Sequence, residues 1–194
     1  MTDIITNPAA ADCLGASSLV TLAALATLSN SSLITPIDNW LTNICSAPKC
    51  SNDTIASVVQ NITEGCESDF NVTAATTIEV EQTYPFIREI LCFKEWVIFF
   101  YFNRLYLRAL DRSGSTNCIT QLLNNIQITD GININIPNLF NLYGNYSDSS
   151  FPPNITCTDC NKAIFNVLNQ PSLSLDVHEA EFESKCGASF IGNY

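Results

Sequence analysis

The apolar residues of this chain recur mainly at the three- and four-residue intervals of an amphipathic α-helix. The clearest run begins near Ser51 or Asn52 and ends at Gly65, a residue type that commonly follows the last turn of a helix. One face of this run carries four apolar side chains, those of Ile55, Val58, Val59 and Ile62. The pattern predicts a helix with that face turned inward.

The same periodicity predicts helices elsewhere along the chain. Four of them span about 17–28, about 35–45, about 158–169, and from about 174 or 176 to 186. A further helix starts at Cys118 or includes it and extends at least to Ile126. Another helical run begins near residue 72, and Pro85 either kinks it or begins a new helix. Thr35 followed by Pro36 fits a helix N-cap and first position, and Gly187 fits the stop after the last helix. Strand-type alternation is confined to residues 131–136, which we interpret as a loop or an edge strand. The expected fold is therefore all-α, with six or seven short helices.

A length of 194 residues favours one domain with a single core, which two similar halves could build together. We interpret residues 1–12 as a loose N-terminal segment and 13–190 as a single helical, Cys-rich domain. Residues 191–194 form a tail, and the composition of 143–153 is that of a loop.

Nine cysteines are spread through the chain, as expected of a disulfide framework made in an oxidising compartment. They are Cys13, Cys45, Cys50, Cys66, Cys92, Cys118, Cys157, Cys160 and Cys186. Zinc is less favoured, because Cys157 and Cys160 have no second pair at zinc spacing and His178 is the only histidine. The expected domain is thus stapled by disulfides. The odd number means that at least one thiol is free, bonds between molecules, or bonds to a residue outside this sequence.

Disulfides between the ends of neighbouring helices satisfy the Cα separation of about 4.4–6.8 Å that the bond requires. On that basis we predict three bonds: Cys92 with Cys118, Cys186 with Cys157 or Cys160, and Cys66 with Cys45 or Cys50.

Six asparagines begin N-glycosylation sequons: Asn30, Asn52, Asn61, Asn71, Asn145 and Asn154. Six sequons beside nine cysteines are typical of a secreted glycoprotein. Asn52 falls at a predicted helix start, and Asn61 lies on the face opposite Val58 and Ile62. We expect heavy glycosylation between residues 50 and 73.

No secretory leader is evident in this sequence. Residues 14–28 have the length of a signal h-region, but Asp3 and Asp12 precede them and no Lys or Arg does. We therefore expect a helix there and a native leader outside this sequence. No run approaches 18 uninterrupted apolar residues, the minimum for a transmembrane helix.

The charge of the chain argues against nucleic acids and anionic membranes as partners. Only 14% of the residues are charged and the formal net charge is −11, so no basic stripe could neutralise nucleic-acid phosphates or an anionic membrane. Uncharged Asn, Ser and Thr provide most of the expected polar surface.

Residues 93–114 differ from the rest in composition. Seven of the 19 aromatic residues lie between Phe93 and Tyr106, and four of the eight Lys and Arg residues lie between Lys94 and Arg112. Three interpretations stay open: a buried helix, an amphipathic element at 96–108 that contacts a membrane or partner, or translated intron over 95–112. In the second case the contact residues would be Trp96, Phe99, Phe100 and Phe102.

The sequence contains no motif of a known catalytic or cofactor site. It has no P-loop, GxGxxG, GxSxG or HExxH motif. A metal site formed by His178, Glu181 and Glu183 is conceivable, but acidic residues gathered on one helix are usually a solvated face. Cys157-Thr-Asp-Cys160 has redox spacing without the preceding strand of a thioredoxin-like unit, so a structural sulfur pair is favoured. We expect no catalytic residue, no cofactor and no metal.

Several short segments of the sequence resemble those of a family of secreted basidiomycete fungal proteins. They are WLTNICSAPKCSNDTIASVVQNITEGC, YPFIREILC, NCITQLL and CTDCNKAIFNVLN followed by CGASF. The family consists of Cys-rich, Ser/Thr-rich glycoproteins, some with a serine-rich or lipid-anchored tail. The resemblance covers most of residues 37–190 and implies kinship rather than a particular activity.

This chain departs from the family pattern in two ways. Family members pass quickly from the equivalent of Cys92 to that of Cys118, without the aromatic segment. They also carry a cysteine between those that match Cys13 and Cys45, and its absence here would explain the odd count.

Together these observations predict a non-catalytic, secreted or cell-surface fungal protein that acts in the wall, in adhesion or in host interaction. Its partners would be wall components or a host protein. The alternatives are an extracellular carrier that holds a small apolar ligand, such as a lipid or sterol, between helices, and, third, a secreted hydrolase.

Overall fold

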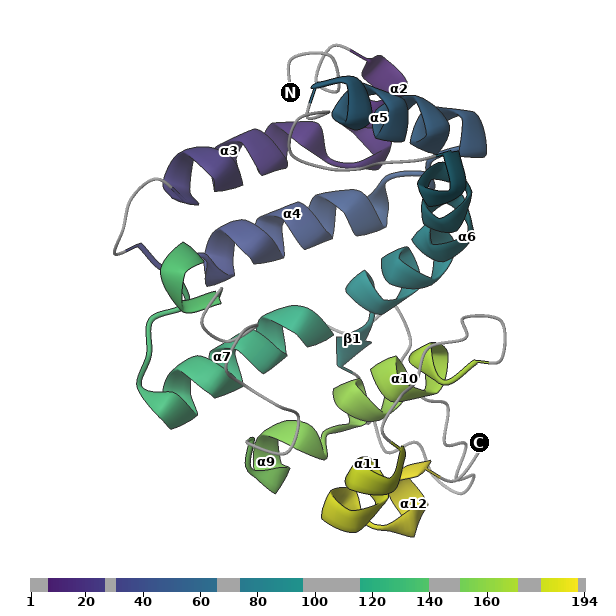
Figure 1. The fold of residues 1–194 in the computed structure, drawn as a ribbon. Coiled ribbons are helices and arrows are strands. Elements are labelled where there is room, and N and C mark those ends of the chain that lie inside the picture. Colours follow the sequence, from purple (N-terminus) through teal and green to yellow (C-terminus); the bar gives the residue numbers. More distant parts are fainter. Residues whose placement is uncertain are drawn as a thin grey trace, which may run out of the picture.

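A computed structural model describes residues 7–26, 31–65, 74–95, 116–139, 151–170 and 179–191. Helices make up most of these residues, and four disulfides tie them together (Figure 1). The only strands in these ranges are a pair of two residues each. The predicted all-α, disulfide-stapled fold is therefore confirmed. Three helices of six residues or fewer, α2, α9 and α12, were not predicted.

The chain becomes helical earlier than predicted. Helix α2 (Pro8–Cys13) begins after Asn7, whose side-chain oxygen accepts hydrogen bonds from the backbone N–H groups of Ala9 and Ala10. Pro8 at the first helical position suits this start, because its missing N–H would have had no partner there. The interpretation of residues 1–12 as loose is thus wrong from Pro8 onward.

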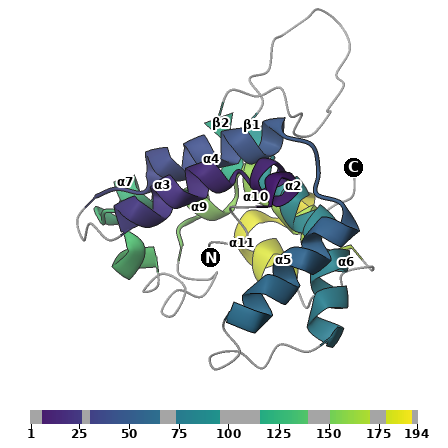
Figure 2. The same ribbon diagram turned by 90° about the horizontal axis from the view of Figure 1, so that it is seen from above.

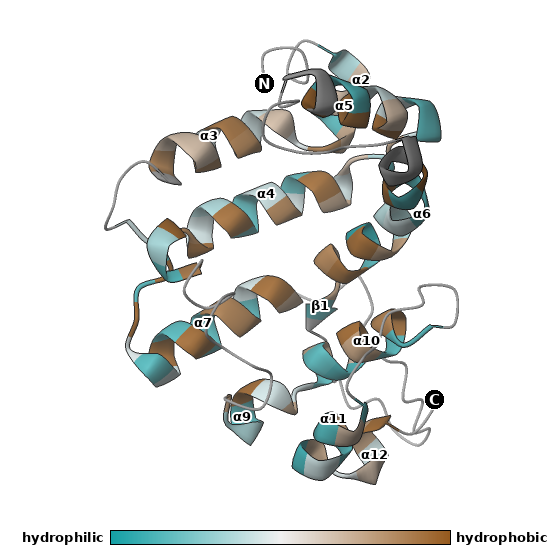
Figure 3. Ribbon diagram, in the orientation of Figure 1, coloured by the Kyte–Doolittle hydropathy of each residue, from teal (hydrophilic) through white to brown (hydrophobic). Residues whose placement is uncertain are grey.

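Three rod-like helices form one side of the molecule: α3 (Ala16–Ala26), α4 (Ile34–Ser46) and α7 (Cys118–Asp130). In Figure 1 they lie one below the other, with α4 in the middle. Figure 3 shows both hydrophobic and hydrophilic residues around α4 and α7, whereas α3 is apolar to neutral along most of its length. Leu41 and Ile44 are the buried residues in the second half of α4. Its N-cap position is occupied by Leu33, so the prediction that Thr35 caps this helix is wrong.

Helices α5 (Asn52–Gly65) and α6 (Ala74–Leu91) pack against each other near one end of α3 and α4, where α2 also lies (Figures 1 and 2). The predicted bounds of α5 are confirmed, and Ile55, Val58 and Val59 are buried as expected. Ile62 is 42% exposed, so its predicted inward position is wrong. Pro85 lies within α6 and does not end it.

Strands β1 (Lys94–Glu95) and β2 (Thr116–Asn117) pair antiparallel immediately before α7. Lys94 is opposite Asn117, and Glu95 is opposite Thr116. The side-chain oxygen of Asn117 then caps α7 by accepting hydrogen bonds from the N–H groups of Ile119 and Thr120. The residues on either side of 96–115 are therefore adjacent in space.

The remaining helices form the C-terminal part: α9 (Pro153–Thr156), α10 (Asp159–Leu168), α11 (Glu179–Cys186) and α12 (Ala188–Ile191). α10 begins close to the predicted position, with Thr158 as its N-cap, and Cys186 ends α11 as predicted. Three rings pack between these helices, with Phe165 and Phe182 centroids 5.1 Å apart and Phe182 stacked on Phe190 at 5.7 Å. Residues 131–135 are irregular and 136–139 helical, so the edge-strand alternative for this stretch is wrong. Ile191 belongs to α12 rather than to a tail.

The described core contains two aliphatic clusters besides these rings. One comprises Cys13, Cys50, Ile55 and Val59, with Leu14 and Tyr84 against it. The other joins Ile34 of α4 to Ile126, Ile134 and Ile155. The second cluster draws on residues before and after the 96–115 segment, so these two parts of the chain share one core.

Candidate functional site

The cysteine framework is the most extensive feature that sequence reasoning singled out. Four disulfides are present: Cys13–Cys50, Cys45–Cys92, Cys118–Cys160 and Cys157–Cys186. Their Cα atoms are 5.1–5.4 Å apart, inside the range that the bond requires. Cys186 bonds to Cys157, one of its two predicted partners. Four disulfides indicate that the chain folds in an oxidising environment.

Two of the predicted bonds are wrong. Cys92 and Cys118 do come close, since the N–H of Cys118 donates to the carbonyl of Phe93 at 2.8 Å. Their sulfurs nevertheless bond elsewhere, because the ends of α4 and α10 bring Cys45 to Cys92 and Cys160 to Cys118. Cys45 and Cys50 are both taken by other partners, which excludes the predicted bonds to Cys66. Cys66 itself lies outside the described residues.

Both parts of the chain use the same order of connection. In each set of four cysteines the first bonds to the third and the second to the fourth. Each set also has its two middle members close in sequence, Cys45 with Cys50 and Cys157 with Cys160. None of the four bonds joins residues before 96 to residues after 115.

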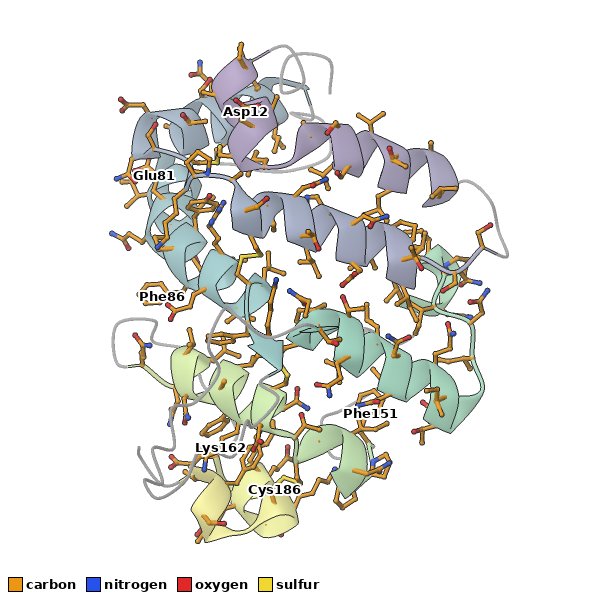
Figure 4. The ribbon with its side chains drawn as sticks, turned by 180° about the vertical axis from the view of Figure 1, so that it is seen from behind. Asp12, Glu81, Phe86, Phe151, Lys162 and Cys186 are labelled. Atoms are coloured by element: carbon orange, nitrogen blue, oxygen red, sulfur yellow. A yellow bond between two sulfur atoms is a disulfide. The ribbon has the colours of Figure 1, made fainter. Side chains whose placement is uncertain are left out.

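The observed bonds rule out two alternatives for Cys157-Thr-Asp-Cys160, a redox centre and a zinc site. A redox centre of this spacing works by forming a bond between its own two sulfurs, and a zinc site needs free thiolates. Here each sulfur is bonded to a different distant cysteine. Figure 4 shows Cys186 beside the C-terminal helices, on the opposite end of the molecule from Asp12. The pair is structural, as the sequence favoured.

The sequons that can be placed lie on helices. Asn52 is the first residue of α5 and is exposed, and Asn154 is exposed on α9. Asn61 is half-buried on α5. Asn30, Asn71 and Asn145 lie outside the described residues. A core position for Asn61 would have refuted the prediction that it lies opposite Val58 and Ile62, and Asn61 is not in the core.

The conceivable metal site cannot be assembled from the described residues. Glu181 and Glu183 are exposed on α11, and His178 lies outside the described ranges. Within those ranges, no three His, Cys, Asp or Glu side chains come together as they would to hold a metal ion.

The proposed membrane or partner contact residues, Trp96, Phe99, Phe100 and Phe102, also lie outside the described residues. In the parts of the chain that the structure describes, no helix is long and apolar enough to cross a membrane.

Sequence reasoning missed Arg88, the one charged side chain that is buried among the described residues, at 6% exposure. Its guanidinium donates to the carbonyls of Cys13, Ile44 and Ala47 and to the hydroxyl of Tyr84. Periodicity does give one signal: Tyr84 and Arg88 are four residues apart, one turn of a helix. What they contact lies in two distant segments, at Cys13 and at residues 44–50, and periodicity does not reveal such contacts.

Comparison with known proteins gave no match to a family model, to a curated protein or to a solved structure.

Proposed function

We propose that this chain is a non-catalytic, secreted or cell-surface glycoprotein of a fungus, acting in the wall, in adhesion or in host interaction. The observation that carries the proposal is the combination of four disulfides with two exposed sequon asparagines, Asn52 and Asn154. Disulfides require an oxidising compartment, and N-glycans are added in the same compartment in eukaryotes. The fungal assignment rests on the resemblance of the cysteine-containing segments to those of the basidiomycete family.

The surface chemistry supports an interaction role. Acidic side chains of the described helices, such as Asp53, Glu79 and Glu179, are exposed and spread over several elements. A net charge of −11 with few basic residues favours polysaccharide or protein partners over phosphate-rich ones. Glycans at Asn52 and Asn154 would cover parts of two separate helices, α5 and α9.

Expression behind a secretory leader in a fungal host tests the proposal. We expect the full chain in the medium or in the wall fraction, with an electrophoretic mobility that increases after endoglycosidase treatment. Asn52→Gln and Asn154→Gln should each remove one glycan. Asn169→Gln is the matched control, because Asn169 is exposed but begins no sequon. Retention inside the cell, or a mobility that endoglycosidase leaves unchanged, contradicts the proposal.

The same preparation tests the molecular role. The secreted protein is incubated with purified fungal wall polysaccharides, and both bound protein and released sugar are measured. Binding without sugar release is expected. Release of sugar identifies a hydrolase instead, and a small apolar molecule retained in native mass spectrometry identifies a carrier.

A further inference from the structure

The buried guanidinium of Arg88 touches the backbone around the cysteines of the N-terminal set. One terminal nitrogen, Nη1, donates to the carbonyl of Cys13 and to the Tyr84 hydroxyl, both at 3.1 Å. The other, Nη2, donates to the carbonyl of Ala47 at 2.6 Å and to that of Ile44. No carboxylate takes part in these four hydrogen bonds, so the charge is balanced by carbonyl dipoles.

Those carbonyls are suited to a cation because they lie at helix ends. Cys13 is the last residue of α2, and Ile44 and Ala47 lie in the last turn and at the C-cap of α4. The last carbonyls of a helix have no partner within it and carry a partial negative charge. Arg88 therefore fixes the C-terminal ends of two helices against α6.

Cys13 and Cys50 hydrogen-bond to Arg88 and Tyr84 side chains through their backbones, while Cys45 and Cys92 are held beside this group by a chain neighbour and by a backbone bond at the end of α6. Cys13 accepts directly, and Cys45 follows Ile44 in the chain. The N–H of Cys50 donates to the Tyr84 hydroxyl at 3.0 Å, and the N–H of Cys92 donates to the Arg88 carbonyl at 3.1 Å. None of these contacts involves a sulfur atom, so all of them can form while the thiols are reduced.

We propose that Arg88 and Tyr84 form a folding device that selects the native disulfides of the N-terminal half. These four cysteines allow three pairings among themselves, and Cys66 adds further non-native ones. With both helix ends held on Arg88, Cys13 is within bonding distance of Cys50, with Cα atoms 5.1 Å apart, and Cys45 of Cys92, at 5.4 Å. The contacts are made before the bonds and decide which thiols meet.

The chemical step is thiol–disulfide exchange. One cysteine thiolate attacks glutathione disulfide, which forms a mixed disulfide and releases one glutathione thiolate. The second cysteine thiolate then attacks the protein sulfur and releases the second glutathione. Two protein thiols and one glutathione disulfide thus give one protein disulfide and two reduced glutathiones. Arg88 takes no part in electron transfer; it positions the two thiols.

Refolding of the full chain tests this device. The reduced, denatured protein is refolded in a glutathione buffer, and the bonds are mapped by mass spectrometry of non-reduced peptides. Arg88→Met should lower the ratio of native to non-native bonds among Cys13, Cys45, Cys50 and Cys92 at least about tenfold, because three carbonyls at helix ends, two of them in buried hydrogen bonds, lose a charged donor. Tyr84→Phe, which keeps the ring and removes the oxygen, should lower it less.

Two references make the result decisive. Cys118–Cys160 and Cys157–Cys186 form in the same molecule, and none of the four side-chain hydrogen bonds of Arg88 reaches their cysteines, so they should form at the wild-type level. Lys49→Met removes an exposed cation between Cys45 and Cys50 and should leave all bonds unchanged. Wild-type bonds in Arg88→Met, equal loss in both halves, or an equal effect of Lys49→Met would overturn the proposal. If Arg88→Met precipitates, Tyr84→Phe decides on the same criteria.

Discussion

Gly15, between α2 and α3, has a backbone φ of 62°, a left-handed conformation that favours glycine. A Cβ atom placed on it would lie 2.9 Å from Cγ2 of Ile44, a side chain that is itself buried. Gly131, at the end of α7, has a nearly equal φ of 66° but no atom within 4 Å of its Cβ position. Both residues therefore have a left-handed backbone, but only at Gly15 would an added side chain meet a neighbouring atom.

Substituting each glycine by alanine separates the two constraints. Gly131→Ala should lower the free energy of unfolding by about 1–2 kcal/mol, the cost of a left-handed non-glycine residue. Gly15→Ala should lower it by a further ~1–3 kcal/mol, because the added methyl group overpacks the contact with Ile44. Urea unfolding of the oxidised proteins measures both values. Equal losses in the two variants would mean that the connection between α2 and α3 moves away from α4 to admit the methyl group.

At the scale of elements, β1 and β2 bring the two ends of the 96–115 segment together. Glu95 and Thr116 are directly opposite in an antiparallel pair, the position from which a two-residue turn can connect two strands. Removal of residues 95–112 as translated intron would eliminate Glu95 but keep Lys94 and Asn117, with four residues, 113–116, left to connect them. Sequencing of the transcript tests that hypothesis. The fold of the described residues does not need a long connection here.

Replacing residues 96–115 by Asn-Gly should therefore preserve the fold. Asn-Gly favours the type I′ turn that matches the twist of paired strands. We expect all four disulfides and a change in melting temperature within about 4 °C, the shift that ~1 kcal/mol produces in a domain of this size. A Gly/Ser segment of the original length is the control for loop length. Loss of Cys45–Cys92 or Cys118–Cys160 in the Asn-Gly variant contradicts the expectation.

Sequence patterns predicted the elements better than the details of their ends. The bounds of α5 and the approximate span of α10 follow from local residues, and both are confirmed. Thr35 was misjudged because the packing of Leu33 and Ile34, both nearly fully buried, begins α4 earlier than the local cap signal. Ile62 continues the period of α5 but lies where α5 has no neighbour to cover it fully, which periodicity alone does not reveal.

At the scale of the whole molecule, the two sets of cysteines are joined only by non-covalent contacts besides the chain itself. Thr120 of α7 donates to a carboxylate oxygen of Asp38 on α4 at 2.7 Å, and the N–H of Leu33 donates to the carbonyl of Ile134 at 2.7 Å. The cluster of Ile34 with three later isoleucines buries apolar surface across the same boundary.

A protease recognition site inserted between residues 96 and 115 would expose this arrangement. After cleavage, a denaturing gel without reductant should show two fragments, because no disulfide joins them. In native gel filtration the fragments should elute together, held by the shared core. A single band that separates only after reduction would refute the assigned bonds. The uncleaved chain, with and without reductant, is the control.

The cysteine pairing could be predicted from sequence only in part. Cys186 ends one helix and Cys157 precedes another, so their bond follows from neighbouring helix ends. Cys92 and Cys118 meet the same criterion, yet each bonds to a cysteine more than 40 positions away. Which of several nearby sulfurs is taken depends on how α4 and α10 pack, a tertiary property that spacing along the chain does not contain.

The order of the disulfides also determines how the molecule would respond to a pulling force. When the two ends of the chain are pulled, the force passes through the disulfide from Cys13 to Cys50, back along the chain to Cys45, and through the second disulfide to Cys92. The rest of residues 13–92 lies outside this path, so it cannot be drawn out. Residues 118–186 are bypassed in the same way through 157–160. The connection from Cys92 to Cys118 is shortened by no bond and could extend to about 90 Å at ~3.4 Å per residue. Under tension the molecule would therefore lengthen between Cys92 and Cys118, while the two disulfide-bonded parts on either side keep their length.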